Sequence, residues 1–128
     1  MSDPLEHLNE LERRCVLLFL GLLTDRLEGN LREIWLFGSF ARGDPWGPNS
    51  PMNSDIDLLI LTDEVVPEAV LESLLNETYP LYLECGRQIA PQFKTASGFQ
   101  NPAEEVGRAF KERVATEGKR VHPPMDAS

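Results

Sequence analysis

The sequence is poor in the residues that build disulfide frameworks, zinc sites and membrane spans. Its 128 residues include two cysteines, Cys15 and Cys85, and two histidines near opposite ends, His7 and His122. A disulfide scaffold, a zinc site and a Cys–His catalytic pair are therefore not expected. The longest apolar stretch, residues 16–23, is interrupted by Gly21 and is far shorter than the ~18 residues that a membrane span needs. We expect a protein without a membrane segment, acting in the reducing environment of the cytoplasm.

Basic residues are also scarce. The chain has 12 Lys and Arg against 21 Asp and Glu, which gives a net charge of −9. Because nucleic acids are bound through Lys and Arg, this balance argues against general nucleic-acid binding, but not against a phosphate ligand carried on a divalent metal. Residues 1–84 hold 16 of the acidic groups and 5 of the basic ones. Two solvated faces of different sign explain this asymmetry; alternatively, the acidic part needs cations and the basic part faces an anion.

The length predicts one domain, which we place at residues 1–120, followed by a loose tail at 121–128. A capping pattern at Asp3, with Pro4 and Glu6, predicts a helix that runs to Gly29. Its expected apolar stripe includes Cys15 as a small buried hydrophobe. The stripe consists of Leu5, Leu8, Leu11, Cys15, Leu18 and Leu22.

The rest of the chain predicts strands and helices in the order strand, strand, helix, strand, helix. Strands are expected at residues 31–37, 55–61 and 86–94, the last confined to a sheet edge or a bulge by Pro91. A helix opens at Pro67 and should end or kink at Pro80. A last helix, capped at Asn101, should present Val106, Phe110 and Val114 on one face and end at Gly118. This order predicts an α/β (α+β) fold with a small mixed sheet flanked by helices.

Two aspartates stand at the start of the second expected strand. Residues i and i+2 of a strand point to the same side, so Asp55 and Asp57 lie next to each other. Two adjacent carboxylates without a cation repel each other, and a divalent metal removes that cost. Oxygen ligands in this arrangement suit Mg²⁺, which binds one or two carboxylates together with substrate phosphates.

A second motif follows the first expected strand. Gly38 lets the backbone approach a ligand closely, and residues 40–42 are expected to begin a short helix. Backbone N–H groups and the Ser39 hydroxyl can hold phosphate oxygens, and Arg42 can add a charge-assisted contact. A phosphate cradle and a metal-binding carboxylate pair on successive strands predict a nucleoside triphosphate site.

Gly38-Ser39, followed by Ser54-Asp55-Ile56-Asp57-Leu58, resembles the signature of the polymerase-beta-like nucleotidyltransferase superfamily. The run from Ala41 to Asp44 and the end of the last helix, Glu117-Gly118, are similar to its small members, the minimal nucleotidyltransferases (MNT). The resemblance implies a palm-like sheet, with Gly38 and Ser39 on the phosphates and Asp55 and Asp57 on Mg²⁺. The implied reaction transfers a nucleotidyl group, most often AMP from ATP, to an acceptor hydroxyl. Small members of this family are commonly antitoxins that bind helical HEPN-domain toxins.

The sequence departs from the family in two places. Fifteen residues separate Ser39 from Asp55, which indicates a loop insertion at residues 45–52. The family's third carboxylate, from a later strand, has no counterpart, because residues 85–103 contain no Asp or Glu. Glu84 or the position of Gln92 could replace it.

Three functions remain open at this point. The first is an Mg²⁺-dependent nucleotidyltransferase that modifies a partner protein, as an antitoxin does. The second is a catalytically degenerate nucleotide-binding module that neutralises a partner by contact alone, and the third is a structural role. The chain is compatible with a homo-oligomer, but the sequence predicts neither its oligomeric state nor its acceptor.

Overall fold

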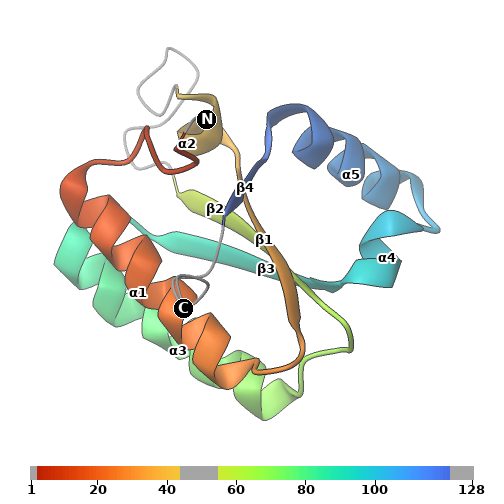
Figure 1. Ribbon diagram of the computed structural model, residues 1–128, viewed down its shortest axis with the longest axis horizontal. Helices are drawn as coiled ribbons and strands as arrows, with labels where there is room; N and C mark the ends of the chain where they lie inside the picture. Colours follow the sequence, from red (N-terminus) through yellow and green to blue (C-terminus); the bar gives the residue numbers. More distant parts are fainter. Residues whose placement is uncertain (1–2, 44–54, 122–128) are drawn as a thin grey trace.

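The computed structural model describes residues 3–43 and 55–121 of the chain. The loop insertion expected at 45–52 and the tail from 122 onward lie outside the described residues. The elements are α1 (Glu10–Arg26), β1 (Leu31–Phe37), α2 (Ser39–Arg42), β2 (Ile56–Thr62), α3 (Glu68–Cys85), β3 (Ile89–Thr95), α4 (Ala96–Gln100), α5 (Glu105–Glu117) and β4 (Lys119–Val121) (Figure 1). None of the helices within these two ranges has the length and apolarity needed to cross a membrane.

The four strands form one mixed sheet in the order β3-β2-β1-β4. Strand β1 pairs antiparallel with β2 and β4, whereas β2 pairs parallel with β3. The expected small mixed sheet flanked by helices is thus confirmed. Strand β3 lies at an edge, as Pro91 requires, because proline cannot donate a ladder hydrogen bond.

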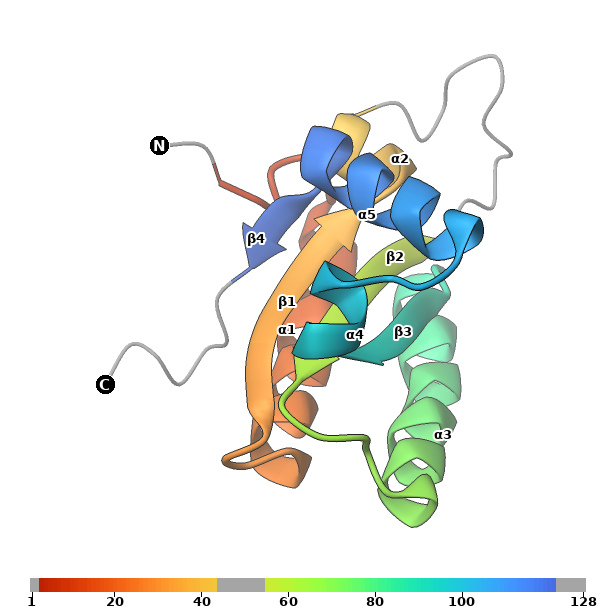
Figure 2. The ribbon, with the colours of Figure 1, turned by 90° about the vertical axis from the view of Figure 1, so that its right-hand side faces the viewer.

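Helices cover both faces of the sheet. Helices α1 and α3 pack together on one face, and α4 and α5 lie on the other (Figures 1 and 2). Strand β2 is buried on both sides, because Ile56, Leu58 and Ile60 belong to the core under α1 and α3, while Leu59 and Leu61 pack with residues of α4 and α5. Since side chains alternate along a strand, Asp57 shares the α5 side with Leu59.

The first helix begins later than the capping pattern at Asp3 indicates. Asn9 is the N-cap: its side chain accepts the N–H of Glu12 at 2.8 Å, and Glu12 Oε1 accepts the N–H of Asn9 at 2.9 Å. Asp3 instead closes a turn by accepting the N–H of Leu5. The expected stripe is partly wrong, because Leu11 and Leu18 are about half exposed (52% and 47%). Cys15 is fully buried, as expected.

The second half of the chain differs from expectation at several boundaries. Helix α3 continues through Pro80 to Cys85, since Leu81 packs into the core with α1. Residues 96–100 form α4, which Thr95 caps by accepting the N–H of Gly98. Helix α5 starts at Glu105 rather than after Asn101, and it leaves Val106 80% exposed.

The end of the described chain belongs to the sheet. Val121, expected to open the loose tail, is the last residue of β4; it is buried and pairs with Ile34 of β1. Helix α5 does end at Gly118, whose N–H donates to Val114 O. A three-residue strand gives little signal in a sequence, because its pairing partner supplies most of its stability.

A buried ion pair joins three of these elements. Arg87 Nε, just before β3, donates to Glu12 Oε2 of α1 at 3.0 Å, and both side chains are less than 10% exposed. The Arg87 guanidinium also lies over the ring of Phe40 in α2, 5.4 Å from its centroid. Glu12 therefore caps α1 with one oxygen and holds Arg87 with the other.

Arg87→Met should destabilise the protein by about 3 kcal/mol, because it leaves the Glu12 carboxylate buried without its cation. Chemical denaturation measures the change. The matched control is Arg14→Met, which removes an exposed arginine 4.0 Å from Glu84 and should cost less than about 1 kcal/mol. Adding Glu12→Gln to Arg87→Met should recover part of the loss. Equal effects of the two arginine variants would contradict this account.

Candidate active site

The ends of β1 and β2 meet at Gly38. Phe37, the last residue of β1, pairs with Asp57 of β2, and Gly38 follows with φ +80°. A Cβ atom at Gly38 would overlap Asp57 Oδ2 and lie 3.2 Å from Asp57 Cγ. Both the positive φ and this close approach require glycine. The predicted phosphate corner and the predicted metal-binding pair are thus brought together.

The two aspartates differ in their surroundings. Asp55 is exposed, directly before β2, and Asp57 is half-buried on the face that α5 covers. Burial raises the pKa of Asp57 to about 6; Arg113 and Arg42 oppose the rise, while the neighbouring charges of Asp55 and Glu117 add to it. Burial disfavours the ionised form of this carboxylate, and a bound cation would stabilise that form.

The short helix α2 carries the other predicted residues. Ser39 is buried at its start, and Arg42 Nη1 donates to Glu117 Oε2 at 2.6 Å. Gly43 ends the helix with φ +86°, and its N–H donates to Ser39 O. The imidazole of His7 packs against Gly43, since a Cβ there would lie 2.9 Å from two ring atoms.

Two residues at the end of α5 join the site without having been predicted. Glu117 Oε1 accepts from Arg113 Nε at 2.5 Å while its other oxygen binds Arg42. The Arg113 guanidinium lies 5.3 Å from the ring centroid of Phe37, the partner of Asp57. The i,i+4 spacing of Arg113 and Glu117 indicates an ion pair, but nothing in the sequence indicates that α5 ends beside Asp57.

The residue paired with Asp57 on β3 is not acidic. In the parallel ladder Ala90 pairs with Asp57, whereas Gln92 pairs with Leu59, one step further along the same face. Glu84 lies in α3, which covers the opposite face of the sheet, and its carboxylate is 4.0 Å from Arg14. Across residues 3–43 and 55–121, no group of three or more His, Cys, Asp or Glu side chains could hold a metal.

The donor set fits a metal that takes few protein ligands. Asp57 offers carboxylate oxygens against the Gly38 backbone, and Asp55, directly before β2, is near enough for its charge to act on Asp57. Mg²⁺ binds through one or two carboxylates when substrate phosphates and water complete its octahedron. The two aspartates can hold such an ion together with a phosphate-bearing ligand.

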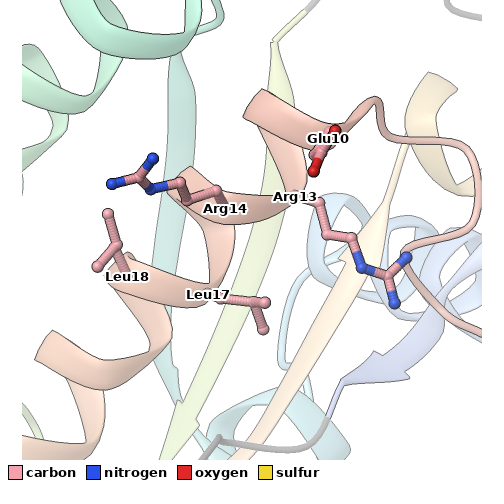
Figure 3. A pocket seen from close by; sticks show the side chains of 5 residues that line it. All are labelled: Glu10, Arg13, Arg14, Leu17 and Leu18. Atoms are coloured by element: carbon pink, nitrogen blue, oxygen red, sulfur yellow. The ribbon is translucent and has the colours of Figure 1, made fainter.

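An open groove on the outer surface of α1 is separate from this site. It is lined by Glu10, Arg13, Arg14, Leu17 and Leu18, all from one helix (Figure 3). Helix α1 covers the face of the sheet opposite to α5, so the groove does not adjoin the aspartates.

Comparisons with known proteins agree with the resemblance seen in the sequence. Residues 22–122 match the nucleotidyltransferase domain family, whereas no curated protein matches. Among solved structures, a toxin–antitoxin complex with AMP-PNP is similar at 23% identity and TM-score 0.52, covering 83% of this chain and 71% of the other. An MntA–HpeT toxin–antitoxin mutant matches at 20% identity and TM-score 0.51, over 83% and 70%. A tri-AMPylated Shewanella oneidensis HEPN toxin in complex with MNT antitoxin matches at 18% identity and TM-score 0.50, over 90% and 75%. At these identities the structures establish a shared fold.

Gly38→Ala should disturb the site far more than Gly29→Ala, its matched control. Both glycines have a positive φ, but nothing lies within 4 Å of a Cβ at Gly29. Gly29→Ala should therefore cost about 1–2 kcal/mol of stability, from backbone conformation alone. Gly38→Ala should cost more and weaken Mn²⁺ binding about tenfold, because it displaces the Asp57 carboxylate. Denaturation and calorimetry measure the two effects. Equal stability losses with unchanged Mn²⁺ affinity would refute the close approach.

Asp57→Asn should stabilise the metal-free protein near pH 7.5. Because the folded-state pKa of about 6 exceeds the ordinary 3.8, the ionised carboxylate opposes folding above pH 6 and has no such effect below pH 4. We expect a gain on the order of 1 kcal/mol in EDTA at pH 7.5 and none at pH 4, after allowance for partial exposure. The control Asp63→Asn removes an exposed acid at the other end of β2, 3.2 Å from Arg32, and should not stabilise. A gain that persists at pH 4 would contradict the raised pKa.

Proposed function

This chain belongs to the nucleotidyltransferase domain family, and we propose that it is an Mg²⁺-dependent nucleotidyltransferase that transfers AMP from ATP to a hydroxyl of a partner protein. The observation that carries the proposal is the contact between Gly38 and the Asp57 carboxylate. With Gly38 against Asp57, the glycine-serine corner lies beside the aspartate pair, which supports the proposal that a triphosphate bound at the corner would reach a metal held by the pair. The fold shared with a toxin–antitoxin complex that holds AMP-PNP supports a nucleotide substrate.

Each residue has a distinct role in this proposal. Asp55 and Asp57 hold the metal, and the half-buried position of Asp57 fixes one ligand while exposed Asp55 adapts to the nucleotide. Gly38 lets phosphate oxygens approach the backbone, the Ser39 hydroxyl donates to them, and Arg42 adds positive charge from the last turn of α2. When bound, Mg²⁺ would neutralise charge on the α-phosphate of the transferred adenylyl group and on the leaving pyrophosphate.

The acceptor is proposed to lie on a second protein. The described part of the chain is one sheet with its covering helices and contains no further unit that would bind an acceptor. Structures with this fold include an MNT antitoxin with a tri-AMPylated HEPN toxin, which supports a HEPN-type partner and a toxin–antitoxin function. Nucleoside triphosphate chemistry and two free cysteines support action in the cytoplasm.

A catalytically degenerate binding module is the second candidate, and Ala90 favours it. Ala90 is the partner of Asp57 on β3, where a third carboxylate would share the metal site. Without that ligand, the metal that travels with the triphosphate keeps Asp55 and Asp57, but activation of the acceptor is weakened. Such a chain would bind Mg·ATP and its partner with little or no transfer.

Transfer is tested with α-³²P-labelled ATP, Mg²⁺ and a purified HEPN-type protein. Label should enter the partner with the parent chain and fall at least about tenfold with Asp55→Asn or Asp57→Asn, because each removes a metal ligand. Asp63→Asn, at the opposite end of β2, should label like the parent. Equal labelling by the double Asp55→Asn/Asp57→Asn variant would overturn the proposed function.

Ala90→Asp distinguishes a weak enzyme from a binding module. The new carboxylate lies opposite Asp57 in the ladder and should raise transfer about tenfold or more, since it supplies a third ligand. Gln92→Glu, one pair further along the same face, is the matched control and should give a smaller gain. If Mg·AMP-PNP binds but neither variant transfers label, the binding-module function is favoured.

A further inference from the structure

One carboxylate links the phosphate corner to the end of α5. Glu117 accepts from Arg42 of α2 with one oxygen and from Arg113 of α5 with the other, at 2.6 and 2.5 Å. Its side chain is 12% exposed, whereas those of Arg42 and Arg113 are 40% and 50% exposed. The acid is thus enclosed beneath two guanidiniums that face solvent.

This arrangement lies next to the aspartate pair. Arg113, Glu117 and Arg42 all act electrostatically on the Asp57 carboxylate, and Arg113 lies over Phe37, the ladder partner of Asp57. Among the described residues, three carboxylates and two guanidiniums therefore share this end of the sheet. If Glu117 were neutral, these two guanidiniums could pair with the aspartates and compete with a metal.

We propose that Glu117 is a positioning residue that holds Arg42 and Arg113 away from Asp55 and Asp57, so that the aspartates stay available to Mg²⁺ and the Arg113 guanidinium to the triphosphate. The inference rests on the proposed function and adds Arg113 as a phosphate-binding residue. A guanidinium has five N–H donors, so the bond from Arg113 Nε to Glu117 does not prevent Arg113 from donating to phosphate oxygens. Both oxygens of Glu117 already accept from arginine, which leaves the acid poorly suited to hold the metal itself.

The test measures Mn²⁺ binding to the full chain by calorimetry, without nucleotide. Glu117→Gln should weaken Mn²⁺ binding about tenfold, the effect of removing an outer partner that orients a metal site. Glu112→Gln, an exposed acid on the same helix, is the control and should bind like the parent. Adding Arg113→Met to Glu117→Gln should recover at least about threefold of the lost Mn²⁺ affinity, because one of the two competing guanidiniums is gone.

If Glu117 had only a structural role, Arg113→Met would not restore the Mn²⁺ affinity that Glu117→Gln loses. If Glu117→Gln binds Mn²⁺ as tightly as Glu112→Gln, or if the double variant stays as weak as Glu117→Gln, the inference is overturned. If Glu117→Gln fails to fold, the Arg113→Met variant alone tests the inference. It should weaken Mg·AMP-PNP binding and leave the Mn²⁺ affinity unchanged or higher. Unchanged AMP-PNP binding would refute the role of Arg113. A parent chain that binds neither Mn²⁺ nor Mg·AMP-PNP would overturn the proposed function itself.

Discussion

The buried ion pair between Glu12 and Arg87 is the constraint on which the arrangement of the site depends. One carboxylate closes the capping box of α1 and neutralises the arginine at the entry to β3, and that arginine lies over Phe40 of α2. A buried charge without its partner costs several kcal/mol, so this pair favours the packing that brings the three elements together. The corner at Gly38 and Ser39, the proposed phosphate site, is thereby attached to the helical layer, while Gly38 lies against Asp57.

The excess of acidic residues in the chain is also seen locally, at the end of the sheet where Asp55 and Asp57 lie. Asp55 and Asp57 lie close together, and the burial that raises the pKa of Asp57 makes a cation the natural partner of the pair. Two arginines stand nearby, and each donates a hydrogen bond to Glu117 at the end of α5. Under the proposed function, this separation of charges would let a chain with a net charge of −9 bind a triphosphate, because a metal at the aspartates would bridge acid to phosphate.

Local patterns in the sequence predict the strands that carry the site. The features that these patterns do not predict depend on tertiary packing. Gly38, Asp55 and Asp57 were predicted because turn chemistry and two-residue alternation are local, and Pro91 correctly marked an edge strand. The start of α1 was misplaced because Asn9 offers a better capping box than Asp3, completed by Glu12. Strand β4 and the approach of Glu117 to Arg42 join residues far apart in the sequence, so no local pattern indicates them. The register that places Ala90 opposite Asp57 likewise appears only when β3 pairs with β2.

The most direct test of the central claim, that Gly38 and the aspartate pair form one nucleotide site, is a crystal structure of the chain with Mg²⁺ and AMP-PNP. The account predicts a metal bound by Asp55 and Asp57 that also contacts the triphosphate, with phosphate oxygens at Gly38 and Ser39. It further predicts Arg42 and Arg113 within hydrogen-bond distance of those phosphates. Nucleotide bound elsewhere, for example in the groove on α1, with no metal at the aspartates, would contradict the account.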